Sequence, residues 1–297
     1  MESRLPRFIR ATDVASIAMT PRDREIIHLV WRHRFLRSSA ITATVGGSHQ
    51  QIVRRLQLLY HHGYLERPRC QIDYYYRGGS RPIVYGLSDK GARFLRHEGF
   101  AVRQVRYSEN NRSVGRIYLE HALLVSDVVT AMRLACNGTD ARLLIDDDLG
   151  GTQPFRWKIS MSNKVTLGVI PDRVFGVKYR DKRGAMAHSY FFLEADRGTM
   201  PVIRKNLLQT SLYRKLLAYE ATWTQSIHQT RFGFDRIRVL FVTTGQERVD
   251  SLVDASAELK RGRGLFLFAD KTILRSADIL QVLIQTGNAG EFSTLLD

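Results

Sequence analysis

Residues 46–56 read Gly-Gly-Ser-His-Gln-Gln-Ile-Val-Arg-Arg-Leu, and this stretch decides the fold of the first part of the chain. A Gly-Gly pair is a turn signal, and the apolar residues after it, such as Ile52 and Leu56, recur at helical spacing. Two further helical patterns precede the turn, at 22–34 and 38–45. The order of helix, helix, turn and helix predicts a helix-turn-helix.

The outward face of the predicted third helix is polar and basic. In a helix-turn-helix, the start of this helix enters the major groove of DNA. Glutamine can pair there with adenine and arginine with guanine. The alternative interpretation is an ordinary solvated helix face. The candidate DNA-binding residues of this helix are Ser48, His49, Gln50, Gln51, Arg54 and Arg55.

Two short strand patterns follow, at 64–67 and 82–87, and they predict a two-stranded wing. The intervening tip is basic, aromatic and rich in glycine. Its arginines are expected to hold phosphates or enter a minor groove, and its tyrosines to pack beneath the wing. The candidate residues are Arg69, Arg77 and Arg81. Together these elements predict a winged helix-turn-helix domain over residues 1–100.

Charge supports the same interpretation. The 297-residue chain has 45 Lys and Arg against 29 Asp and Glu, a net charge of +16. Residues 1–100 hold 17 basic and 8 acidic residues, and residues 101–297 hold 28 and 21. The positive excess is therefore densest in the predicted DNA-binding domain, which indicates double-stranded DNA as a partner. A merely solvated surface is the alternative.

Other classes of protein are disfavoured. The apolar runs are far too short to cross a bilayer, and the basic start at 1–10 lacks the apolar stretch of a secretory signal. Cys70 and Cys136 have no metal-binding spacing, and no glycine-rich stretch carries the Lys-Ser/Thr of a phosphate loop. We expect a cytoplasmic, nucleoid-associated bacterial protein with no membrane contact and no ATP.

A second domain is expected over 117–297, after a linker at 101–116. Helical and strand patterns alternate there in the order typical of an α/β layered domain, so the whole chain is α+β. The predicted helices are at 117–136, 202–223 and 247–260, with a further one at 279–284. The predicted strands are at 141–145, 189–195, 236–243 and 264–269.

Carboxylates cluster at two strand ends of this domain. Asp172 follows a proline, and Glu194 and Asp196 stand two residues apart, so their side chains share one side of an extended chain. Glu120 in the long helix is a possible fourth member. Asp172, Glu194 and Asp196 are the candidate catalytic residues, and Asp172 and Glu194 the candidate ligands for Mg²⁺ or Mn²⁺. The alternative is an ion-pair network in which Asp196 pairs with Arg197 or Arg204.

The Pro171-Asp172 pair, followed by Glu194-x-Asp196, resembles the PD-(D/E)xK nuclease superfamily, which implies a restriction-endonuclease-like α/β fold. The family motif has a lysine two places after the second acid, where this chain has Asp196. Possible displaced substitutes are Lys178, Lys205 and Arg197. Because that lysine activates the attacking water, its absence argues against hydrolysis and predicts a degenerate domain that needs no cofactor.

A broader resemblance is to the replication-relaxation family of plasmids and mobile elements. It rests on the predicted winged helix, the Pro171-Asp172 turn, the run 193–199 and the pattern Lys215-Leu216-x-x-Tyr219. The resemblance implies a winged helix joined to a nuclease-like domain, with a role in plasmid replication control or mobilisation.

Three functions remain open at this point. The first is a transcription or replication regulator that binds DNA as a homodimer, with 207–219 and 279–284 as interface candidates. The second is a metal-dependent endonuclease or nickase. The third is an accessory protein that acts through a plasmid replication or mobilisation protein.

Overall fold

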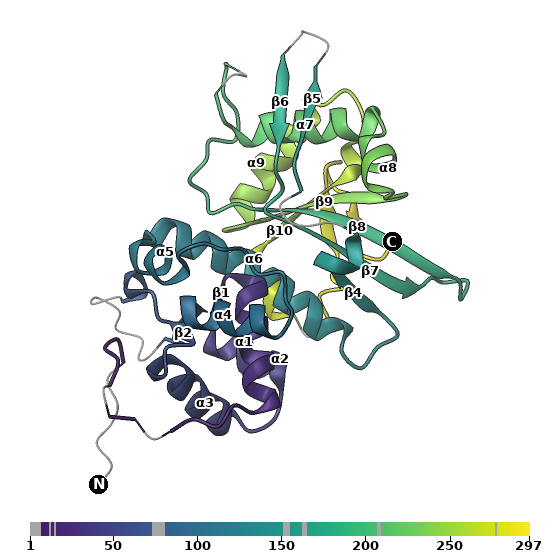
Figure 1. Cartoon of the computed structure of the whole chain (residues 1–297). Coiled ribbons are helices and arrows are strands. Elements are labelled where there is room, and N and C mark those ends of the chain that lie inside the picture. The colour runs from purple at the N-terminus through teal and green to yellow at the C-terminus, as the bar shows by residue number, and fades with distance from the viewer. Residues whose placement is uncertain are drawn as a thin grey trace. The chain divides into compact units, whose positions relative to one another are not determined.

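The computed structural model describes residues 7–11, 13–14, 16–72, 81–150, 155–161, 165–206, 209–276 and 278–297 (Figure 1). The chain divides into two compact units, Met1–Thr130 and Ala131–Asp297. Each unit combines helices with a β-sheet, so the expected α+β composition is confirmed.

The first unit contains six helices and a small sheet among its described residues. The helices are α1 (Pro21–His33), α2 (Ser38–Val45), α3 (His49–His61), α4 (Asp89–His97), α5 (Tyr107–Ser113) and the first part of α6 (Arg116–Cys136). The strands are β1 (Phe35–Arg37), β2 (Leu65–Glu66) and β3 (Val84–Leu87), with a 3-10 turn η1 (Arg69–Gln71) before β3. The sheet is antiparallel in the order β1-β3-β2.

The ends of these helices follow from their capping residues. Thr20 caps α1: its hydroxyl accepts from the Asp23 amide, and Asp23 accepts from the Thr20 amide at 2.8 Å. Ser88 caps α4 by accepting from the Gly91 amide. Gly46, with a φ of +71°, ends α2 in a backbone conformation that favours glycine. The turn between α2 and α3 is therefore explained by the residues that form it.

The segment expected to be a linker, 101–116, contains α5. Asn111 is buried and donates a hydrogen bond to the Leu87 carbonyl at 2.6 Å, which ties α5 to β3. Val102 belongs to the core of the first unit. The division into units falls later than the expected boundary, within α6 after Thr130.

The second unit is built on a seven-stranded sheet in the order β12-β11-β10-β9-β8-β7-β4. Its strands are β4 (Arg142–Ile145), β7 (Arg173–Arg180), β8 (Met186–Ala195), β9 (Ile237–Thr243), β10 (Phe266–Asp270), β11 (Ile284–Thr286) and β12 (Phe292–Ser293). A hairpin, β5 (Trp157–Ser160) and β6 (Thr166–Val169), forms a separate two-stranded sheet. The helices are α7 (Leu212–Thr224), α8 (Ile227–Phe232) and α9 (Gln246–Ala257), with 3-10 turns η2 (Asp146–Leu149), η3 (Arg263–Leu265) and η4 (Lys271–Arg275).

One face of this sheet carries the main core. Phe192, Val239 and Phe241 point to the same cluster as Leu216 of α7 and Leu252 of α9. All five side chains are fully buried. Burial of this kind contributes about 1.5 to 3 kcal/mol for each large apolar side chain, which makes α7 and α9 integral to the unit.

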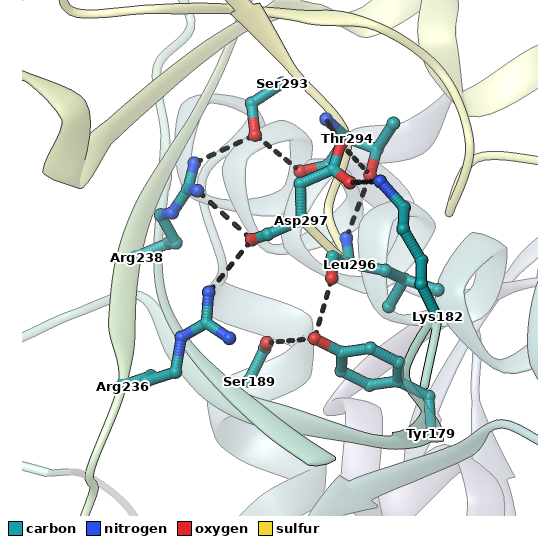
Figure 2. A network of polar contacts seen from close by, with 9 residues as sticks. All are labelled: Tyr179, Lys182, Ser189, Arg236, Arg238, Ser293, Thr294, Leu296 and Asp297. Carbon is teal, nitrogen blue, oxygen red and sulfur yellow. Dashed lines mark hydrogen bonds and ion pairs between the residues drawn. The ribbon is translucent and has the colours of Figure 1, made fainter. Parts of the chain in front are cut away.

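Arg236, immediately before β9, and Arg238 on β9 alternate with the core residues Ile237 and Val239 and contact the segment 293–297 (Figure 2). Both guanidinium groups donate to the main-chain oxygen of Asp297, at 3.3 and 3.2 Å. Tyr179 donates to the Leu296 carbonyl at 2.7 Å, and Lys182 pairs with the Asp297 carboxylate at 3.1 Å. The end of β12 and the residues that follow it therefore connect β7 to β9.

Several expectations from the sequence are corrected. The helix expected at 202–223 begins only at Leu212. The expected helix at 279–284 is absent, since residues 279–281 form a turn and Ile284 begins β11. The strands β1, β5, β6, β11 and β12 were not expected. In the part of the chain that the structure describes, no helix is long and apolar enough to span a membrane.

Candidate functional site

The outward face of α3 is the first candidate surface. Ile52 and Leu56 point into the core of the first unit, with no exposed surface. The opposite side chains are exposed because helical periodicity places them away from that core. These exposed residues, at the start of α3 or on its outer face, are Ser48, His49, Gln50, Gln51 and Arg54.

Arg55 differs from its neighbour Arg54. Its guanidinium forms a two-point ion pair with Asp23, whose carboxylate is completely buried, and also donates to the Ala18 carbonyl. Burial alone would raise the pKa of Asp23, but hydrogen bonds from Arg55 and Thr20 outweigh it and hold that pKa below its ordinary value. Arg55 thus joins α3 to the start of α1.

The other described DNA-binding candidates lie between β2 and β3 in the sequence. Arg69 is exposed in η1, and Arg81 is exposed just before β3. Gln71 holds this region together, since its side chain accepts from the Val84 amide and donates to the Val84 carbonyl. Arg77 lies outside the described residues.

The second candidate site is the carboxylate cluster at the ends of β7 and β8. Asp172 lies immediately before β7 and accepts the Ala195 amide at 2.8 Å. Glu194 is buried at the end of β8. Its two oxygens are bound by Lys215 and by the Tyr219 hydroxyl, the latter at 2.5 Å. The cluster therefore joins two strand ends to one face of α7.

Asp196 is also buried, with different partners. It accepts from the Thr243 hydroxyl at 2.8 Å, from the Gly198 amide at 3.1 Å and from the Arg248 guanidinium at 2.8 Å. The cation that the described contacts place on Asp196 is Arg248, where the sequence suggested Arg197 or Arg204. The interpretation of Asp196 as a member of an ion-pair network agrees with the contacts, and α9 supplies the cation.

Burial dominates the electrostatics of Glu194. It raises the pKa of Glu194 to about 7, with Lys215 opposing this shift and Asp172 adding to it. Burial would lower the pKa of Lys215, but Glu194 and Asp172 raise it above the ordinary value. Burial and the neighbouring Glu194 also raise the pKa of Tyr219 well above its ordinary value. Lys215 therefore stays protonated beside a carboxyl group that titrates near neutral pH.

Lys215 lies beside Glu194, where the nuclease motif would place the lysine that position 196 lacks. No described contact places Lys178 or Lys205, the substitutes expected from the sequence, beside Glu194. Lys178 is six residues from Asp172 along an extended strand, about 20 Å away, and Lys205 is exposed. The i, i+4 spacing of Lys215 and Tyr219 was a usable signal, because it places both side chains on one helix face.

The cluster is a poor fit for a divalent metal ion. Mg²⁺ and Mn²⁺ need several free carboxylate oxygens, whereas the carboxylate oxygens of Glu194 and Asp196 already accept hydrogen bonds from protein groups. Among the described residues, no group of three or more His, Cys, Asp or Glu side chains could hold a metal ion. Glu120 is half-exposed and pairs with Arg116 in the first unit.

Comparison with known proteins connects these features to one class. The family model for replication-relaxation proteins matches residues 27–237, which is more than half of the chain and includes α3 and the Glu194 cluster. The chain therefore belongs to the replication-relaxation family, as its sequence motifs indicated. No curated protein matches the chain. Family membership associates it with the replication of plasmids and other mobile elements.

Proposed function

We propose that the protein is a sequence-specific DNA-binding regulator of replication or transcription on a plasmid or mobile element. The observation that carries this proposal is the outer face of α3. Glutamine, histidine and arginine side chains are exposed there at the start of a helix, where base edges could be read. Such a role would place the protein on the bacterial nucleoid.

The interpretation of the first unit as a winged helix is part of this proposal. It is supported by three helices in the expected order and by a three-stranded antiparallel sheet, β1-β3-β2, around them. The wing of this proposal consists of β2 and β3, which pair antiparallel. Arg69 and Arg81, which lie between these strands in the sequence, would contact phosphates, with Arg77 as a further candidate.

In this proposal the second unit is a degenerate restriction-endonuclease-like domain. The protein donors that surround Glu194 and Asp196 support a structural role for these acids. The unit would mediate homodimerisation or bind a plasmid replication or mobilisation protein. Leu212 and Leu216 of α7 are not available for this, because they are buried in the core of the unit. Light scattering on the free protein would measure the oligomeric state.

The direct test is selection of bound duplexes from a randomised library, followed by affinity measurements on the selected site. Wild-type protein should enrich a defined sequence. Arg54→Ala should weaken binding to that site by roughly 1 to 3 kcal/mol for a lost base contact, with little effect on random DNA. Enrichment of no sequence by the wild-type protein would overturn the proposal.

A metal-dependent nuclease is the second candidate function, and the Lys215–Glu194 pair favours it. A lysine from α7 beside Glu194 could replace the motif lysine that position 196 lacks. The test is supercoiled plasmid incubated with Mg²⁺ or Mn²⁺, with Asp172→Ala and Lys215→Ala proteins alongside. Nicked or linear product that disappears in both variants would establish cleavage. Intact DNA with all three proteins would exclude it.

A further inference from the structure

The segment from Arg197 to Lys215 carries five basic residues and no acidic one. The second unit as a whole has 24 basic and 18 acidic residues, so outside this segment 19 basic residues nearly balance the 18 acids. Almost all the positive excess of the unit therefore comes from the connection between β8 and α7 together with the first turn of α7. The five residues are Arg197, Arg204, Lys205, Arg214 and Lys215.

The fold brings the segment with Arg204 and Lys205 close to the start of α7. The amides of Leu212 and Tyr213 donate to the carbonyls of Pro201 and Val202, at 3.1 and 2.8 Å. Lys205 is three residues beyond Val202, which limits their separation to about 11 Å. Arg204 and Lys205 are therefore held near the first turn of α7, which carries Arg214 and is followed by Lys215.

The charges of Arg204 and Lys205 are not neutralised by acidic side chains of the described residues. Lys215 turns inward to Glu194. Arg204 and Lys205 are exposed, and Arg204 donates to the neutral side chain of Gln209 at 2.8 Å. Neither forms an ion pair with a described residue. Two exposed cations without acidic partners, beside further arginines, are suited to an anionic ligand.

We infer that Arg204 and Lys205, held close to the first turn of α7, form a basic rim that binds phosphate groups of duplex DNA. The choice of DNA rests on the proposed function, which brings the first unit onto a duplex. A guanidinium fork and an ammonium group both bind phosphate oxygens without reading bases. The basic rim gives the second unit its own sequence-independent contact with DNA.

The test uses the full chain and a duplex of random sequence, with affinity measured over a series of salt concentrations. Arg204→Ala with Lys205→Ala should reduce the slope of log affinity against log salt by about 2, because two phosphate contacts are lost. The matched control is Lys260→Ala with Arg261→Ala, which removes two exposed cations elsewhere in the unit and should leave the slope unchanged. Thermal melting of both variants checks that they are folded.

The result separates this inference from the proposed function. If the Arg204/Lys205 variant keeps the wild-type slope, or changes it no more than the control does, the basic rim does not bind DNA. An acidic protein segment would then be the better ligand. If the slope falls while wild-type protein selects no preferred sequence, the basic rim stands and the sequence-specific function does not. Arg54→Ala should change selectivity and leave the contribution of the basic rim intact.

Discussion

The outer face of α3 and the Glu194 cluster contain similar polar residues in opposite situations. On α3, side chains such as Gln50 and Arg54 are exposed to solvent. In the cluster, Glu194 and Asp196 are buried and every carboxylate is held by a lysine, arginine, hydroxyl or amide donor. Exposed polar groups are available to a ligand, whereas satisfied buried groups mainly specify the fold. This difference supports recognition by the first unit and a structural role for the cluster.

The sharpest test of this comparison lies within α3. Arg55→Ala should lower the free energy of unfolding by roughly 3 to 5 kcal/mol, because it leaves the buried Asp23 carboxylate without its cation. Arg54→Ala, one residue away and exposed, should change it by less than about 0.5 kcal/mol. Urea unfolding of the two variants measures both values. Equal stabilities would contradict the division between an inward and an outward arginine.

Removing the cation of the cluster should have the next largest effect. Lys215→Met should lower the free energy of unfolding by roughly 2 to 4 kcal/mol, less than for a fully buried pair because the Lys215 side chain is 34% exposed. Adding Glu194→Gln should restore part of this loss, since the uncompensated acid is then gone. A double variant whose loss equals the sum of the two single losses would show that the pair is not coupled.

Stability should also depend on pH through Glu194. Its pKa is raised from 4.5 to about 7 by burial, so the folded protein keeps a proton that the unfolded chain releases. Its contribution is therefore fully present below about pH 4.5 and is lost as the pH rises to about 7. Across that pH range, the free energy of unfolding of the wild type should fall by up to about 1.4 kcal/mol per pH unit more than that of Glu194→Gln. Urea unfolding of both proteins at several pH values measures this difference. If the assignment is wrong, their free energies of unfolding will change with pH in parallel.

The smallest expected effect concerns the wing. Arg81→Ala should weaken binding to all DNA sequences alike and reduce the salt slope by about 1, as expected for one lost phosphate contact. Titrations of the selected site and of random DNA at several salt concentrations measure both quantities. A loss confined to the selected site would instead indicate that Arg81 contacts bases, so recognition would extend beyond α3.

Local signals predicted most of the first unit. The turn at Gly46 and the apolar spacing in α3 lie within a few residues of the elements that they define. These signals predicted α1, α2 and α3 correctly. The strand β1 was not expected, because three residues contain too little alternation to be distinguished from the helices on either side.

The second unit was less predictable, because its partners are distant in sequence. Pairing of Asp196 with Arg248 spans 52 residues, and no local pattern indicates it. The helix expected from 202 starts at Leu212, where Ser211 caps it by accepting from the Arg214 amide. The acids themselves were found from their spacing. The i, i+4 spacing of Lys215 and Tyr219 was visible in the sequence, but their contact with Glu194, and that of Arg248 with Asp196, became visible only once α7 and α9 were placed on the sheet.

The segment 293–297 has a consequence for the order of folding. Tyr179 and its acceptor, the Leu296 carbonyl, are 117 residues apart, so this contact closes a long loop (Figure 2). Long loops are costly to close, and the contacts that close them form late. During synthesis, the first unit has all of its residues well before β7 can meet 293–297. The first unit should therefore be folded while the second sheet is still incomplete, and pulse proteolysis of arrested nascent chains would reveal that order.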